Sequence, residues 1–243
     1  MQISDDIMLG PVYTSRVNSD GPSEMELGVG PMGRVYVYDV VPLALNLLGI
    51  AAAQAVAGAG NLTLTTAATG VTYATLDGVA NLILDVPRNV DILSSSASDT
   101  ATVMTIYGYD AYGQAMSEAI TNNGTTRVAG KKAFKRIYRV AASGVAVGNI
   151  SVGFGDIIGL PYRLLSKDYM IQSNFNATAV ALSAVNAAVL TSPATTITGD
   201  VRGSIALPSA ADGVKRLVAA MAIPGIACGP NATRLGALGV TQV

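Results

Sequence analysis

The residue types that most often perform chemistry in proteins are nearly missing from this chain. It contains no histidine and a single cysteine, Cys228, among 243 residues. Histidine is the commonest general base and metal ligand, and a lone cysteine without a histidine to activate it is more often a small buried apolar residue than a nucleophile. No CxxC or Cys/His cluster is present for zinc. The sequence therefore predicts no enzyme, with no catalytic, cofactor-binding or metal-ligating residues.

One glycine motif, Gly28 to Gly33, has the GxGxxG spacing of dinucleotide-binding loops. That function needs a strand before the motif and a helix after it, so that the phosphate meets the helix N-terminus. Here an acidic, irregular segment precedes the motif, the strand-like sequence RVYVYDV follows it, and Pro31 removes one backbone N–H. We therefore interpret the motif as part of an arm rather than as a nucleotide site.

The clearest charge asymmetry is a run of basic residues without an acidic residue between Glu118 and Asp156. Three interpretations fit this run: a solvated edge strand protected by lysine, docking on an acidic protein surface, or contact with nucleic acid. Because alternate side chains of a strand point to opposite faces, few of the charges can converge on phosphates. We therefore predict protein docking and no nucleic-acid binding, with the docking residues Lys131, Lys132, Lys135, Arg136 and Arg139.

The overall composition points to an assembly. Half of the residues are hydrophobic, only 13% are charged and the formal net charge is −1, whereas about a quarter of residues are charged in an ordinary soluble domain. The apolar surplus must enter lipid or other protein chains. The best membrane candidate, residues 40–59, is interrupted by polar residues, proline and glycine, and the first residues do not match a Sec signal. We expect no membrane contact and instead self-association, as a homotrimer or alternatively as a dimer.

Short alternating segments with glycine and proline between them predict an all-β protein. Residues 1–48 are expected to form an extended N-terminal arm, although residues 34–40 alternate and can pair at a sheet edge. Residues 49–243 are expected to form one β-sandwich domain, either jelly-roll-like or Ig-like. Its core is placed at residues 50–165, and strands within 166–243 complete it.

Several local signals refine this prediction. The residues from Asp110 to Gly113 predict a tight turn between two strands, because aspartate starts such turns and glycine tolerates a positive φ. Pro87 is expected to end the strand before it, because proline cannot donate to a β-ladder. Residues 160–165 are predicted as a further short strand, and residues 176–190 suit either a helix or a strand.

The segments that carry a family resemblance lie within residues 80–165 and 199–220. They are Asp85-Val86-Pro87-Arg88-Asn89-Val90, the hairpin Tyr107-Gly108-Tyr109-Asp110-x-x-Gly113, Gly130-Lys131-Lys132-Ala133-Phe134-Lys135, Gly155-Asp156-x-x-Gly159-Leu160-Pro161-Tyr162 and DVRGSIALPSAADGVKRL. Through them the chain resembles virion structural proteins of tailed bacteriophages, and in particular head decoration (capsid cement) proteins.

The resemblance implies a structural protein without an enzymatic site. Such a protein binds the outer face of the capsid and stabilises contacts between subunits of the major capsid protein, which is the expected partner. It is located on the capsid exterior of the virion, and in the host cytoplasm during assembly. The alternative is a tail or fibre structural protein, including a receptor-binding β-sandwich, because similar sandwiches occur in heads, tails and fibres.

Overall fold

The computed structural model describes residues 32–76, 78–189, 191 and 195–224. Within these residues the regular elements are β-strands and short 3-10 helices, and all strand pairings are antiparallel. The elements are β1 (Met32–Val40), β2 (Asn46–Ala55), β3 (Gly60–Asn61), β4 (Val71–Leu76), β5 (Val79–Ser94), β6 (Val103–Tyr109), β7 (Ala115–Thr121), β8 (Val128–Ala129), β9 (Phe134–Ala142), β10 (Asn149–Gly159), η2 (Lys167–Tyr169), β11 (Met170–Phe175), β12 (Thr178–Ala179), η3 (Leu182–Ala184), β13 (Val185–Asn186), β14 (Ser204–Ala206) and β15 (Leu217–Pro224). The all-β prediction is confirmed, and the curled antiparallel sheet agrees with a sandwich-like or jelly-roll-like fold.

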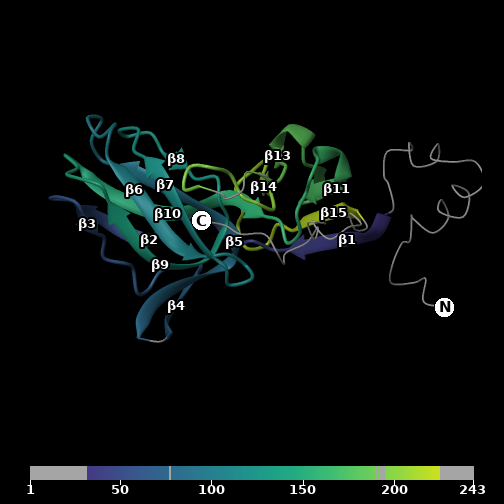
Figure 1. Cartoon of the computed structure of the whole chain (residues 1–243), viewed down its shortest axis with the longest axis horizontal. Coiled ribbons are helices and arrows are strands. Elements are labelled where there is room, and N and C mark those ends of the chain that lie inside the picture. Colours follow the sequence, from purple (N-terminus) through teal and green to yellow (C-terminus); the bar gives the residue numbers. More distant parts are fainter. Residues whose placement is uncertain (1–31, 77, 190, 192–194, 225–243) are drawn as a thin grey trace, which may run out of the picture.

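The strands form two sheets of unequal size. The large sheet has eleven strands in the order β13-β14-β10-β5-β9-β6-β7, with β2, β3, β4 and β8 paired beside this path. The small sheet has four strands in the order β1-β15-β11-β12. The two sheets lie at opposite ends of an elongated body, and the pair of β4 with the start of β5 projects from its side (Figure 1).

Two hydrophobic cores correspond to these two ends. The first lies in the large sheet and includes Phe134, Phe154 and Ile137, all fully buried. The second joins Phe175 and Leu217 of the small sheet to residues of strands β5, β10, β13 and β14 of the large sheet, namely Val86, Ile158, Val185 and Ile205. We call the part around the first core the large lobe, and the part around the second core the small lobe.

The longest strand, β5, connects the two lobes because it does not end at Pro87. It runs for 16 residues from Val79 to Ser94, so the predicted end at Pro87 is wrong. The pairings of β5 explain this. Its register with β9 shifts between Ile83 and Arg88, and its register with β10 shifts beside Arg88. Proline is tolerated at such irregularities because no ladder hydrogen bond from its nitrogen is needed there.

The folded body begins earlier than the predicted arm boundary at residue 48. Strand β1 pairs with β15 from Met32 to Val40, and β2 pairs with β10 from Asn46 onward. The alternation at residues 34–40 therefore does correspond to a strand at a sheet edge. The arm prediction for residues 1–31 lies outside the described residues. Strands β11, β12 and β15 join β1 in the small sheet, and the single domain expected at residues 49–243 stays a prediction.

The predicted turn at Asp110 is confirmed in detail. The Asp110 carboxylate accepts hydrogen bonds from the backbone N–H groups of Tyr112 (2.7 Å) and Gln114 (2.9 Å), and Gly113 has φ +79°. Residues 160–165, in contrast, form no strand. They run beside the loop before β14, where the N–H of Leu164 donates to the carbonyl of Arg202. Residues 176–189 are mostly irregular, with only the short elements β12, η3 and β13.

A buried arginine links several chain segments between the two cores. The Arg88 side chain is fully buried, and its Nη2 lies 3.0 Å from Asp156 while its Nη1 lies 3.1 Å from Asp85. Its Nε donates to the carbonyl of Gly155 at 2.7 Å. A buried guanidinium needs such full pairing, because an unpaired charge there is strongly unfavourable.

Among the described residues, no helix has the length and apolarity required to cross a membrane.

Candidate functional site

The outer face of strands β6 and β9 carries two of the predicted docking residues on one surface. Tyr107 pairs with Arg139 and Tyr109 pairs with Arg136, while Gly108 pairs with Ile137. The register therefore skips Tyr138, which is the extra residue of a β-bulge. In a regular strand, residues 136 and 139 would point to opposite faces. The bulge turns both arginines to the face away from the buried Ile137.

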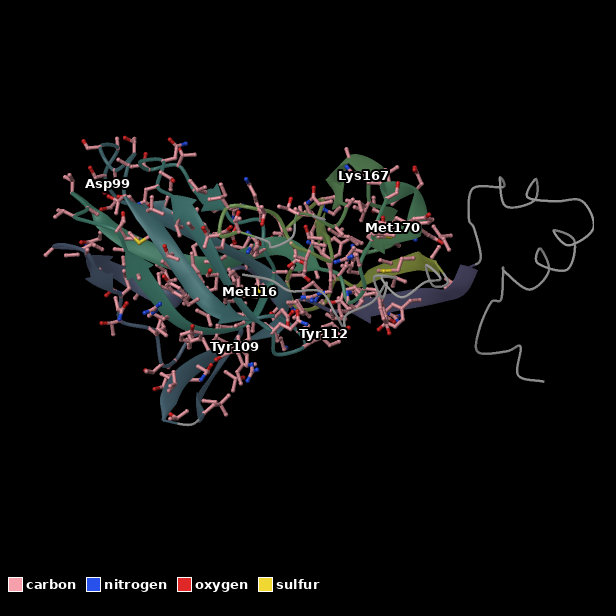
Figure 2. The ribbon with its side chains drawn as sticks, in the orientation of Figure 1. Asp99, Tyr109, Tyr112, Met116, Lys167 and Met170 are labelled. Carbon is pink, nitrogen blue, oxygen red and sulfur yellow. The ribbon has the colours of Figure 1, made fainter. Side chains whose placement is uncertain are left out.

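The two arginines lie over tyrosine rings from the neighbouring strand. The Arg139 guanidinium carbon is 3.8 Å from the centroid of the Tyr107 ring, and that of Arg136 is 4.7 Å from the Tyr109 ring. Tyr138 lies between them, with its ring centroid 5.5 Å from that of Tyr109. We call this surface the Tyr–Arg face: Tyr107, Tyr109, Arg136, Tyr138 and Arg139. All five side chains are half-buried, and Tyr109 lies near the middle of the molecule (Figure 2).

The close approach of β6 and β9 at the bulge requires glycine at position 108. A Cβ atom there would lie 2.1 Å from the backbone oxygen of Arg136 and 2.8 Å from the Phe134 ring. We therefore expect Gly108→Ala to lower the free energy of unfolding by about 1–3 kcal/mol, as overpacking does in cores. Urea denaturation measures this change. The control is Gly144→Ala, because a Cβ at residue 144 meets no atom within 4 Å; equal losses in the two variants would contradict the steric argument.

The remaining predicted docking residues lie elsewhere. The Lys135 ammonium donates to the carbonyl oxygens of Leu84 (2.6 Å) and Asp85 (2.8 Å), and thus attaches β9 to β5. Lys131 is exposed and lines a separate cavity. The structure thus brings Arg136 and Arg139 together and leaves the lysines apart from them. The docking role of these arginines and lysines stays a prediction.

Lys132 differs from the expectation of a surface residue, because it is fully buried. The backbone before it is held by Glu118, whose carboxylate accepts hydrogen bonds from the N–H groups of Lys131 (2.5 Å) and Lys132 (3.2 Å). Asp200 accepts a hydrogen bond from the N–H of Ala133 at 3.0 Å. Burial lowers the pKa of Lys132, and the charges of Glu118 and Asp200 oppose that shift. Lys132 therefore belongs to the interior and is not on the surface of this chain.

A cavity of about 470 Å³ lies beside this buried group. Its polar lining comes from Lys131, Lys167, Asn186, Asp200 and Ser204, and most of the other lining residues are glycine or alanine. The Asp200 carboxylate accepts hydrogen bonds from the backbone N–H groups of Ala133 and Arg202. In the described part of the chain, no group of three or more histidine, cysteine, aspartate or glutamate residues is placed to hold a metal ion.

Sequence reasoning missed the two tyrosines of β6. A usable signal was present, because Tyr107 and Tyr109 alternate with the buried Ile106 and Gly108 and must share the outer face. Their pairing with arginines of β9 depends on the register and on the bulge, which lie in long-range contacts. Planar cations stacked on tyrosines present apolar area and hydrogen-bond donors together, and this combination suits the recognition of another protein.

The chain was also compared with known proteins. No protein-family model, no curated protein and no solved structure matches it.

Proposed function

We propose that the protein is a structural subunit of a phage virion, namely a capsid decoration protein that binds the outer surface of the major capsid protein shell. The observation that carries the proposal is the Tyr–Arg face. Tyrosine and arginine, together with tryptophan, are the residue types most enriched among the residues that dominate protein–protein binding energy. Here three tyrosines and two arginines lie on one sheet surface, outside the core. The sequence resemblance to decoration proteins supplies the class of partner.

The geometry favours a protein partner over nucleic acid. Only two guanidinium groups converge on the face, and both stack on tyrosines of the same chain. Nucleic-acid binding gains affinity with each phosphate that is neutralised, so two charges give little of it. Against a protein, the same groups speed association and fix orientation, while the tyrosines supply buried area. Many copies on one shell then add up to firm attachment, although each contact has ordinary affinity.

The proposal is tested with shells of the major capsid protein that lack this subunit. We expect the double variant Arg136→Ala/Arg139→Ala to bind such shells at least about 30-fold more weakly than the wild type, because the loss of two central arginines typically costs more than 2 kcal/mol. Co-sedimentation at increasing protein concentration measures the affinity. The control is Arg216→Ala, which removes a more exposed arginine from the small lobe.

Two kinds of outcome would contradict the proposal. The first is that the wild type does not co-sediment with shells at all, or that the double variant co-sediments as well as the wild type. The second is that the wild type binds single-stranded DNA tightly at about 0.15 M salt and loses this binding in the double variant, since salt of that strength already weakens contacts to few phosphates. The number of copies per virion distinguishes a capsid decoration protein from a tail or fibre protein, because a shell protein occurs in far more copies.

A further inference from the structure

The strand β4 forms the outer edge of a hairpin that projects from the body (Figure 1). Its six residues pair with the start of β5, from Val71 opposite Leu84 to Leu76 opposite Val79, without a register shift. Among the described residues β4 pairs with no other strand. One side of β4 therefore presents the backbone N–H and C=O groups of a regular strand, which is the arrangement that pairs most readily with another chain.

The other edge strands in the described part of the chain carry features that hinder such pairing. Strand β1 has a register shift near its start, and its Asp39 forms an ion pair with Arg216. The N–H of Ala119, in the edge strand β7, donates to the carbonyl of Thr196 at 2.8 Å. Strands β3, β8, β12 and β13 have two residues each. Strand β2 has two register shifts against β10, and its Ile50 carbonyl accepts a hydrogen bond from the N–H of Thr65 at 2.9 Å. Strand β4, with the sequence VTYATL, has no charge, no proline and no bulge.

The hairpin exposes three large apolar side chains. Tyr73 is 41% exposed, Leu76 39% and Val79 48%. The outer part of the hairpin, from Ala74 opposite Asn81 to Leu76 opposite Val79, has no third strand within the part of the chain that the structure describes, because β9 pairs with β5 only from Leu82 onward. A two-stranded ribbon on its own is only marginally stable in water. The exposed apolar side chains and the free edge occur in the same short segment, and a strand added along β4 would cover the edge and place its own side chains beside those of Tyr73 and Leu76.

We infer that a second copy of this chain supplies that strand, so that β4 pairs antiparallel with β4 of the partner across a two-fold axis. In such a symmetric pair one residue lies opposite itself, and residues at equal distances on its two sides lie opposite each other. A charged strand would then place like charges close together, which is unfavourable. Strand β4 carries no charged side chain, as pairing with an identical strand requires. A partner with a different sequence would not require β4 to lack charges. The inference concerns self-association and does not rest on the proposed function.

The oligomeric state tests the inference directly. We expect the wild type to show a concentration-dependent monomer–dimer equilibrium in sedimentation. Thr75→Lys, an exposed position of β4, is expected to raise the dimer dissociation constant about tenfold or more, because each dimer gains two ammonium groups at the shared edge. The matched control is Thr178→Lys in β12, which is equally an exposed strand position. A wild type that stays monomeric up to about 1 mM, or a dimer that Thr75→Lys does not weaken, overturns the inference.

Cysteine cross-linking supplies a second, independent measurement. In a Cys228→Ser background, single cysteines are placed at Thr72, Tyr73, Ala74 or Thr75. Because two cysteines with Cα atoms more than about 7 Å apart cannot form a disulfide without backbone movement, only the position that lies opposite itself should cross-link efficiently under mild oxidation. Its neighbours should cross-link several-fold less. Equal cross-linking at all four positions, or none at any of them, contradicts a registered β4–β4 pair.

Discussion

Replacing Asp110 with alanine is expected to lower the free energy of unfolding by about 3–5 kcal/mol, because it leaves the buried Arg202 without its partner charge. Arg202 Nη1 lies 2.8 Å from Asp110 Oδ2, and the two side chains are 2% and 0% exposed. The same carboxylate also fixes the turn between β6 and β7 through two backbone N–H groups. The substitution therefore removes the acceptor of the two turn hydrogen bonds and also leaves the buried Arg202 guanidinium without an ion-pair partner.

Urea denaturation at neutral pH measures the effect, and two further variants separate its causes. Asp110→Asn keeps a side-chain oxygen that can accept the hydrogen bonds of the turn and removes only the charge. It should therefore lower the free energy of unfolding by less than Asp110→Ala does. The double variant Asp110→Ala/Arg202→Met removes both charges and should be more stable than Asp110→Ala alone, because no unpaired cation remains buried. A loss below about 1 kcal/mol for Asp110→Ala, in the range of a solvent-exposed ion pair, would contradict the role given to the pair.

The parts of the fold that follow local rules were predictable from the sequence. The alternation along β6 and β7 sets their buried faces, and Asp110 with Gly113 sets the turn between them. These features depend on residues within a few positions of one another. The predicted fold class follows from the repetition of such segments.

The features that were mispredicted, and the geometry of the candidate site, depend on partners far along the chain. Pro87 lies within β5 because the registers with β9 and β10 shift beside it. Lys132 is buried because Glu118 and Asp200, 14 and 68 positions away, lie around its segment. The joint placement of Arg136 and Arg139 needs the bulge at Tyr138. None of these features can be read from the spacing of residues that are close in the sequence. The candidate site could therefore be predicted only as a charged strand.

Glu118 is expected to make the protein less stable as the pH rises from about 4.5 to about 7. Burial raises the pKa of Glu118 from its ordinary value of 4.5 to about 7, although hydrogen bonds from the N–H groups of Lys131 and Lys132 oppose the shift. Within this window the folded protein keeps a proton that the unfolded chain has released. The folded state therefore binds more protons, and the free energy of unfolding falls with rising pH, by about 3 kcal/mol over the whole window.

The variant Glu118→Gln isolates this contribution, because glutamine resembles the protonated acid and does not titrate. We expect the difference in unfolding free energy between pH 5 and pH 8 to shrink by about 2–3 kcal/mol in this variant. Burial also raises the pKa of Asp91, to about 6, so part of the pH dependence should persist. Asp212→Asn serves as a control, because backbone hydrogen bonds from Lys215 and Val214 lower the pKa of Asp212 from 3.8, below the tested range. If Glu118→Gln keeps the full pH dependence of the wild type, the buried carboxylate is already ionised throughout this window, and the stabilising contacts of its ionised form outweigh the effect of burial.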